Sequence, residues 1–270
     1  MPFAPVNGID LYYEVHGSGP PLVFAHGSGG NHLSWWRQVP FFSTRYTCIT
    51  FDHRSFGSSR DDEAIGRGAF ADDLRGLLDH LGIDSVSIVA HSMGGRTGVG
   101  FALRNPGRVT GLVLSGSNGG SVNDESRALW AERQERNKSL RGKGVVLGLS
   151  TAFAADNPEH TFLYRQILRM NPRHEPDFLA VPTDYRGSTH ERLAESGVPI
   201  LYIVGDEDAL APPRTIEIAA SQVPQARLLR VPGAGHAVYY EQPERFNREV
   251  LAFLDDVHPP AAGADDGASP

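Results

Sequence analysis

The sequence predicts an α/β fold, in which a mostly parallel central sheet carries helices on both faces and an inserted helical cap. Short apolar runs alternate with amphipathic helical stretches over most of the 270 residues. Strands that alternate with helices are joined by right-handed crossovers, and such crossovers make neighbouring strands parallel. One long segment breaks the alternation, because it is helix-prone and poor in strand signals. That segment is the predicted cap.

The expected strands are short and mostly apolar. They cover residues 9–15, 22–25, 46–51, 85–90, 109–114, 199–204 and 226–231. A turn-rich segment, Gly-Ser-Gly-Pro-Pro, joins the first two strands. We expect this opening hairpin to add antiparallel pairing at one edge of the sheet.

The expected helices fill the gaps between the strands. The clearest has an apolar face and ends at a glycine, which is a common helix stop. Its apolar side chains are Phe70, Leu74, Leu77, Leu78 and Leu81. Prolines suit the first turn of a helix, so Pro213 and Pro243 each predict a helix start. Further helices are expected around residues 34–42 and between the strands at 85–90 and 109–114.

The predicted domain organisation is a core interrupted once. Residues 1–120 and 196–257 are expected to form the core, and residues 121–195 a cap of three or four helices. A packed helical subdomain without a role in substrate binding is the alternative for the cap. Residues 258–270, rich in Gly, Ala and Asp, are expected to be a disordered tail.

The composition excludes several classes of protein. A chain with 40% hydrophobic and 21% charged residues can bury a sizeable core. Its formal net charge of −7 gives no general affinity for nucleic acid or for an anionic membrane surface. No apolar run approaches the ~20 residues that a membrane span needs, and no secretory signal opens the chain. We therefore expect a cytoplasmic protein.

Cys48 is the only cysteine, so the chain can form neither an internal disulfide nor a Cys-rich zinc site. It lies in the apolar run at residues 46–51. We expect it to be a small buried hydrophobic side chain rather than a redox group.

A candidate nucleophile lies where a strand is expected to end and a helix to begin, in the segment Ala-His-Ser-Met-Gly-Gly at residues 90–95. A tight turn there holds a serine hydroxyl clear of the backbone, and its crowding requires small residues two positions before and after the serine. Ala90 and Gly94 meet this requirement, although glycine is usual at the first place. We predict that Ser92 is the nucleophile. The alternative is an ordinary helix N-cap.

A glycine-rich loop, residues 24–30, follows the second expected strand. Glycines let backbone N–H groups approach a substrate closely, and acyl transfer needs two such donors for its oxyanion. We predict the backbone N–H groups of Ser28 and Met93 in this role. Phosphate binding is the rival function for such a loop, but neither of the usual glycine patterns for phosphate can be written here.

The base and its acid are predicted from two loops. A serine hydroxyl needs a base, and the chain has 11 histidines. His236 is favoured, because it follows a flexible loop after the last expected strand. Its acid is expected in the loop after residues 199–204, where Asp208 is favoured over Asp206 because it lies furthest past the strand.

Substrate contacts are predicted more broadly. Besides Gly27 in the glycine-rich loop, the candidates are aromatic residues after this loop and in the cap: Trp35, Trp36, Trp130, Phe153 and Phe162. Core packing explains each aromatic residue at least as well. Arg96 could meet an anionic substrate, although a helix-packing role is favoured, and His26 is expected to be structural. Four loop or cap histidines also stay candidates: His32, His160, His174 and His190.

Taken together, these residues resemble the α/β-hydrolase superfamily over nearly all of residues 6–256. The resemblance is carried by five separated segments: His26-Gly27, residues 91–95, Gly205-x-x-Asp208 with Pro212-Pro213, Gly235-His236 with Glu241-x-Pro243, and residues 52–59. In the last segment Ser55 stands where the family usually has glycine. The resemblance implies a sheet of about eight strands, a catalytic triad in the chain order Ser, Asp, His, and no metal or organic cofactor.

The nucleophile narrows the expected activity. Haloalkane dehalogenases and epoxide hydrolases resemble this layout but attack with aspartate, whereas this chain has Ser92. The esterase and enol-lactonase group is most similar, so we expect hydrolysis of a small-molecule ester or lactone through an acyl-enzyme. The alternatives are carbon–carbon bond hydrolysis of a vinylogous diketone and a slow-turnover ligand receptor of the same fold. The oligomeric state stays open.

Overall fold

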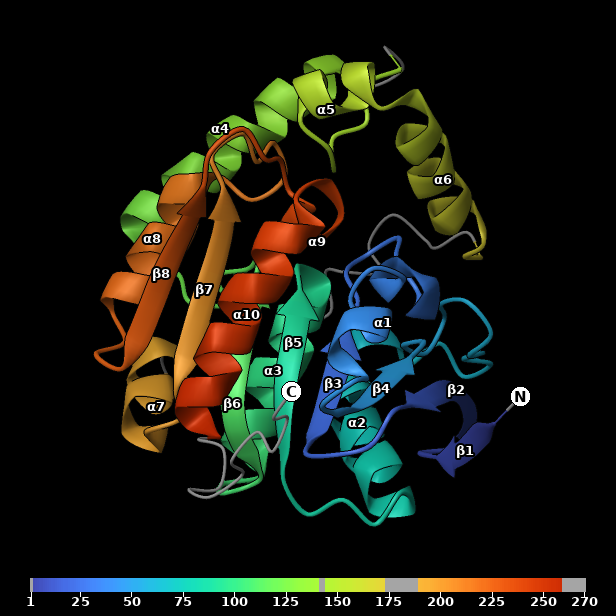
Figure 1. The fold of residues 1–270 in the computed structure, drawn as a ribbon. Coiled ribbons are helices and arrows are strands. Elements are labelled where there is room, and N and C mark those ends of the chain that lie inside the picture. The colour runs from blue at the N-terminus through green and yellow to red at the C-terminus, as the bar shows by residue number, and fades with distance from the viewer. Residues whose placement is uncertain (1, 141–143, 173–188, 259–270) are drawn as a thin grey trace, which may run out of the picture.

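A computed structural model of the protein describes residues 2–140, 144–172 and 189–258. They form one eight-stranded sheet with the strand order β1-β2-β4-β3-β5-β6-β7-β8, set between helices (Figure 1). This confirms the predicted fold class. The strands are β1 (Phe3–Val6), β2 (Ile9–His16), β3 (Pro21–Ala25), β4 (Thr47–Phe51), β5 (Val86–His91), β6 (Val109–Ser115), β7 (Ile200–Gly205) and β8 (Ala226–Val231).

Strand pairing is parallel from β4 across the sheet to β8. β2 is the exception, since it pairs antiparallel with β1 and with β4. The antiparallel hairpin is therefore β1–β2, closed by Asn7 and Gly8, whose φ angles of 43° and 76° suit a two-residue turn. The predicted hairpin between the strands at residues 9–15 and 22–25 is wrong. These strands are β2 and β3, and β4 lies between them in the sheet.

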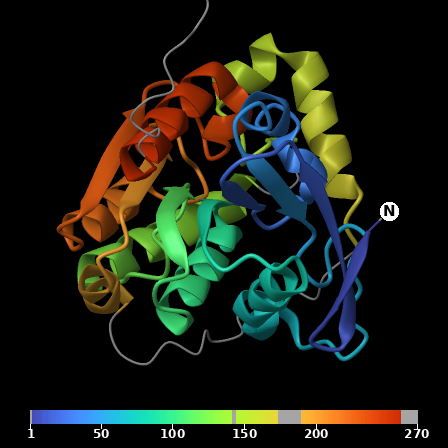
Figure 2. The same cartoon turned by 60° about the horizontal axis from the view of Figure 1, so that its bottom comes forward.

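Both faces of the sheet are buried. On β3, Leu22 and Phe24 belong to one hydrophobic cluster and Val23 and Ala25 to the other, as the two-residue period of a strand requires. Long helices of the core cover the second cluster, and α1 (Val39–Phe42) and α10 (Pro243–Val257) cover the first together with shorter or cap helices given below (Figures 1 and 2). The second cluster is covered by α2 (Phe70–His80), α3 (Met93–Arg104), α7 (Thr189–Ser196) and α8 (Pro213–Ser221).

The shorter helical elements lie in the loops that leave the sheet. The helix expected around residues 34–42 is divided into a 3-10 turn and α1, and α9 was not predicted at all. These elements are η1 (His32–Trp35), η2 (Gly66–Ala69) and α9 (Val238–Glu241).

Three helices arch over the carboxyl ends of the strands, which lie at the top of Figure 1. They are α4 (Asp124–Leu140), α5 (Thr151–Asp156) and α6 (Pro158–Arg169). The predicted cap, residues 121–195, also contains α7. That helix lies with the core instead, because its Leu193 is fully buried in the same cluster as α2 and α3. The name cap is therefore used below for α4–α6 and the described residues between them.

Two predictions fall partly outside the described residues. Residues 173–188 of the predicted cap and residues 259–270 of the predicted tail are not described. His258, the first residue of the predicted tail, is placed beside the sheet, where its Nε2 lies 3.0 Å from Ser87 Oγ.

Cys48 lies fully buried on β4, and its surroundings raise the pKa of the thiol to about 12. Within the described ranges, no helix combines the length and the apolar character that crossing a bilayer would require.

Candidate active site

Ser92 lies on the turn between β5 and α3. Its φ of 51° and ψ of −112° are unusual for a residue with a side chain and mark a strained backbone. The turn is held because the Ser92 N–H donates to the Ser115 carbonyl at 2.9 Å. A Cβ atom at Gly94 would lie 2.3 Å from the Ala25 carbonyl oxygen, so the position two residues after the serine admits only glycine.

His236 and Asp208 meet above the sheet from two different loops. His236 follows β8, Asp208 follows β7, and His236 Nδ1 lies 2.8 Å from Asp208 Oδ2. The other carboxylate oxygen accepts hydrogen bonds from the N–H groups of Leu210 and Ala211, at 2.8 and 2.7 Å. Asp208 and His236 are each 4% exposed. An ionised Asp208 can only accept, so Nδ1 carries the proton and Nε2 is left as an acceptor.

Asp206 occupies a different environment. Its Oδ1 accepts a hydrogen bond from Arg230 Nε at 2.9 Å, at the exposed edge of β8. The structure therefore brings Asp208, and not Asp206, to His236.

The His236 ring is closely surrounded on the sheet side. Gly116, with a φ of 59°, lies so close that a Cβ atom there would be 2.9 Å from two atoms of the ring. The His91 ring packs at a centroid distance of 4.6 Å, and its Nε2 lies 3.2 Å from the His236 carbonyl oxygen. Burial holds the pKa of His91 well below its usual range, so this ring stays neutral beside His236.

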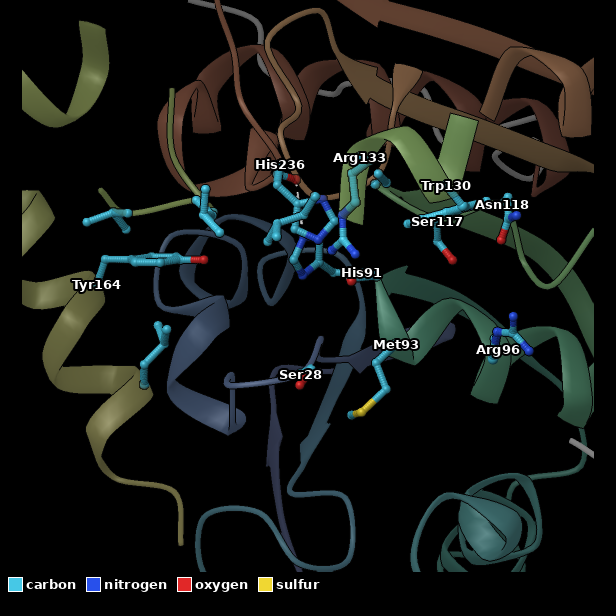
Figure 3. A pocket seen from close by; sticks show the side chains of 18 of the residues that line it. Ser28, His91, Met93, Arg96, Ser117, Asn118, Trp130, Arg133, Tyr164 and His236 are labelled. Carbon is cyan, nitrogen blue, oxygen red and sulfur yellow. Dashed lines mark hydrogen bonds between the residues drawn. The ribbon is translucent and has the colours of Figure 1, made fainter. Parts of the chain in front are cut away.

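A cavity of about 670 Å³ lies between the sheet edge and the cap (Figure 3). Ser92 and His236 both line it, although no hydrogen bond joins these two described side chains to one another. Catalytic hydrogen bonds are often long in unliganded structures and tighten when substrate binds. Ser28 and Met93 line the same cavity, and neither of their backbone N–H groups donates to another group of the described chain.

The predicted substrate contacts divide between the cavity and other places. Trp130 lines the cavity (Figure 3), whereas Trp35 is fully buried against Phe24 and Tyr239 and does not line it. The remaining candidates also lie outside this lining: Trp36 and Phe153 beside Tyr240, Phe162 with 65% exposure at a neighbouring hollow, and Gly27 at a small hollow next to Ser28.

The candidate histidines of the loop and the cap lie away from the cavity lining as well. His32 Nδ1 lies 2.8 Å from Asp52 Oδ1, and His160 stacks on Trp36 at 6.2 Å. His190 belongs to α7 on the core, and His174 lies outside the described residues.

His26 and the segment at residues 52–59 pack beneath the cavity lining and contact each other beside the glycine-rich loop. His26 is fully buried, and its Nε2 accepts a hydrogen bond from the His53 N–H at 3.0 Å. Burial lowers the pKa of His26 to about 4, so the ring is neutral and its place is structural. Ser55 has a φ of 68°, the backbone conformation that a glycine at this position would take without strain.

Two of the side chains that line the cavity were not predicted from the sequence. Arg133 and Tyr164 both point into the cavity in Figure 3. Arg133 could not be singled out, because α4 is charged along its whole length and this arginine does not differ from its neighbours in the sequence. Tyr164 was hidden because an aromatic residue on an amphipathic helix is equally explained by packing. Among the described residues, no cluster of three or more His, Cys, Asp and Glu side chains could hold a metal ion.

Comparison with known proteins agrees with this fold. A model of the alpha/beta hydrolase family matches residues 22–249. The chain belongs to this family. Its relatives of similar length include hydrolases with different substrates.

Three relatives are informative. The putative carbamate hydrolase RutD of Azorhizobium caulinodans is 28% identical to this hydrolase, over 95% of this chain and 99% of its own. The solved structure of a thermophilic esterase from Thermogutta terrifontis is 27% identical, with a TM-score of 0.75 and coverage of 95% and 98%. Est816, described as an N-acyl homoserine lactone degrading enzyme, is 26% identical, with a TM-score of 0.72 and coverage of 93% and 100%. These relatives support hydrolase activity on small molecules.

Proposed function

We propose that this hydrolase cleaves a carboxylic ester or lactone through an acyl-enzyme, with Ser92 as nucleophile, His236 as base and Asp208 as the acid that orients it. The observation that carries the proposal is the shared cavity: a serine on a strained turn and a histidine bonded to a buried carboxylate line the same cavity. A serine hydroxyl becomes an effective nucleophile when a neighbouring base accepts its proton.

The chemistry follows from these positions. His236 Nε2 accepts the proton of Ser92 Oγ as that oxygen bonds to the substrate carbonyl carbon, and the carbonyl oxygen becomes an oxyanion. The N–H groups of Ser28 and Met93 donate to the oxyanion, each typically contributing ~3 kcal/mol to the transition state. His236 then returns the proton to the leaving alcohol oxygen. Water, deprotonated by the same ring, later releases the acid and restores Ser92.

The three named relatives support an oxygen ester or a related bond as the substrate. One is an esterase, one degrades an N-acyl homoserine lactone, and one is named as a putative carbamate hydrolase. In hydrolysis of an ester, a lactone or a carbamate, a nucleophile attacks a carbonyl carbon and the leaving group accepts a proton as it departs.

Fluorophosphonate labelling together with hydrolysis of p-nitrophenyl acetate tests the proposal. We expect the wild-type protein to be labelled on Ser92 and to release nitrophenolate over many turnovers, and we expect the Ser92→Ala variant to do neither. Labelling without repeated turnover would favour the ligand-receptor alternative. A wild-type protein that leaves esters and lactones intact but cleaves a vinylogous diketone would favour carbon–carbon bond hydrolysis.

A further inference from the structure

The cavity is lined by positive charge, although the chain as a whole carries a formal net charge of −7. Four arginines line it: Arg67, Arg96, Arg133 and Arg165. Among the described residues that line it there is neither an aspartate nor a glutamate. The described part of the lining thus offers arginines and no carboxylate, and a lining of one charge attracts a substrate of the other.

Arg133 differs from its neighbours on α4. Two other cations of this helix have partners on it, Arg127 with Asp124 and Lys138 with Glu135. Arg133, by contrast, has no carboxylate within 4.0 Å among the described residues. Its Nε is buried without a hydrogen-bond partner in the described chain. Its side chain points into the cavity in Figure 3.

The Arg133 guanidinium is nevertheless held in place. Its Cζ lies 5.3 Å from the centre of the Trp130 ring, over which it stacks. The helix is anchored to the loop that carries Asp208, because Asn137 Nδ2 donates to the Ala209 carbonyl at 2.9 Å. This hydrogen bond holds the helix that carries Arg133 against the loop that carries Asp208.

A half-buried guanidinium with no hydrogen bond or ion pair is unfavourable, because it has lost part of its hydration and the contact with the Trp130 ring replaces only part of it. Burial lowers the pKa of Arg133 below its usual value and the charge of Asp208 opposes that shift, but arginine stays protonated in proteins. A carboxylate matches its planar fork with two parallel hydrogen bonds, which is the geometry that arginine favours over lysine.

We propose that Arg133 binds a carboxylate group of the substrate, so that this hydrolase acts on esters or lactones that carry a free acid as well as the scissile bond. The inference rests on the proposed function for the scissile bond, but the carboxylate site itself does not depend on turnover. Trp130 forms the wall that keeps the guanidinium plane turned toward the cavity. Ser92 attacks at a carbonyl separated from that acid by a short chain.

The test compares each half-ester with its neutral counterpart. The substrates are the monomethyl and dimethyl esters of succinate, glutarate and adipate, and the measured quantity is kcat/KM. We expect the wild-type protein to prefer the half-ester at one chain length. We expect Arg133→Gln to lower the ratio of half-ester to diester about 10- to 100-fold, as loss of a charged hydrogen bond does. Arg133→Lys, which keeps the charge and loses the fork, should give an intermediate ratio.

Arg127→Gln is the matched control, because Arg127 lies on the same helix, is exposed and pairs with Asp124. Its ratio should equal that of the wild-type protein, and thermal unfolding of all variants shows whether they fold. A wild-type preference for every diester, or an Arg133→Gln ratio equal to the wild-type ratio, overturns the proposal.

Binding of free glutarate, succinate and adipate by calorimetry separates the two proposals. Arg133-dependent binding of at least one of these acids, without Ser92-dependent hydrolysis of any ester, would support the carboxylate site and refute the proposed function. Ser92-dependent hydrolysis with acid binding that is equal in wild type and Arg133→Gln, or absent from both, would support the proposed function and refute the carboxylate site.

Discussion

The two walls of the cavity are built in different ways. On the sheet wall, Ser92 and His236 come from turns at the ends of β5 and β8, and Asp208, from the loop after β7, lies behind His236; backbone N–H groups or neighbouring rings hold all three. On the cap wall, Trp130 and Arg133 come from α4, in which only Ser126 and Asn137 are buried.

This difference separates the two tasks that we propose for the cavity. The sheet wall places reacting atoms, and a buried frame is what keeps them in register. The cap wall is partly exposed, and of its two side chains Trp130 also packs against a hydrophobic cluster of the sheet. We therefore expect substitutions on the sheet wall to act on kcat and substitutions on the cap wall to act on substrate preference.

Ser92→Ala should have the largest effect, because it removes the proposed nucleophile. We expect kcat for p-nitrophenyl acetate to fall at least ~10⁴-fold, with the fold intact. Steady-state kinetics measure the loss, and circular dichroism checks the fold. Activity within a factor of ten of the wild type would show that another group attacks the substrate.

Asp208→Asn should have the next largest effect. The amide can no longer fix the His236 tautomer or stabilise its charged form, so kcat should fall about 10³- to 10⁴-fold. Asp206→Asn is the matched control, since Asp206 bonds Arg230 at the exposed edge of β8. Equal losses in the two variants would remove the distinction between these carboxylates.

Trp130→Ala tests the cap wall. It removes an aromatic surface from the cavity, so we expect KM to rise about tenfold for the preferred ester while kcat changes less. Phe162→Ala provides the comparison, because Phe162 is 65% exposed and lies outside the lining of this cavity. A loss confined to kcat in Trp130→Ala would contradict the proposed division of tasks.

Substitution of Glu241 should have the smallest effect. This residue connects the two walls. Its Oε1 accepts hydrogen bonds from the N–H groups of Gly235, beside His236, and of Ser150, before α5, at 3.0 and 3.2 Å. Burial raises the pKa of Glu241 to about 6 from 4.5. A raised pKa means that the folded state binds this proton more tightly, so the resulting stability is present at low pH and is lost as the pH rises through 4.5 to 6.

Glu241→Gln should remove that loss, because the amide does not ionise. We expect the free energy of unfolding of the variant, relative to wild type, to rise by about 2 kcal/mol across this window. Denaturant titrations at several pH values measure it. A difference between variant and wild type that stays constant with pH would contradict a buried, titrating Glu241.

The sequence predicted most of the fold because its signals are local. β8 begins and ends where expected, and β5, β6 and β7 differ from their predicted ranges by a residue or so. β1 was missed because it has four residues and contains Pro5, which weakens the strand signal. Its pairing with β2 could not be predicted, since the apolar pattern of a strand does not name its neighbour.

The candidate site shows the same limit. Asp208 could be chosen over Asp206 because position along a loop is a local property. The places of Arg133 and His91 in the cavity depend on contacts between distant elements, α4 with the loop after β7 in one case and β5 with the loop after β8 in the other. α7 was assigned to the cap because its buried Leu193 does not reveal which surface it meets.

The buried thiol on β4 has a practical consequence for studying the cap. With its pKa near 12 and its side chain sealed in the core, Cys48 is expected to be silent toward maleimide reagents while the protein is folded. A single cysteine introduced on the outer surface of α4 would then be the sole site of labelling. Fluorescence from a dye attached there would report directly on whether α4–α6 shift when a ligand enters, with no native cysteine to remove beforehand.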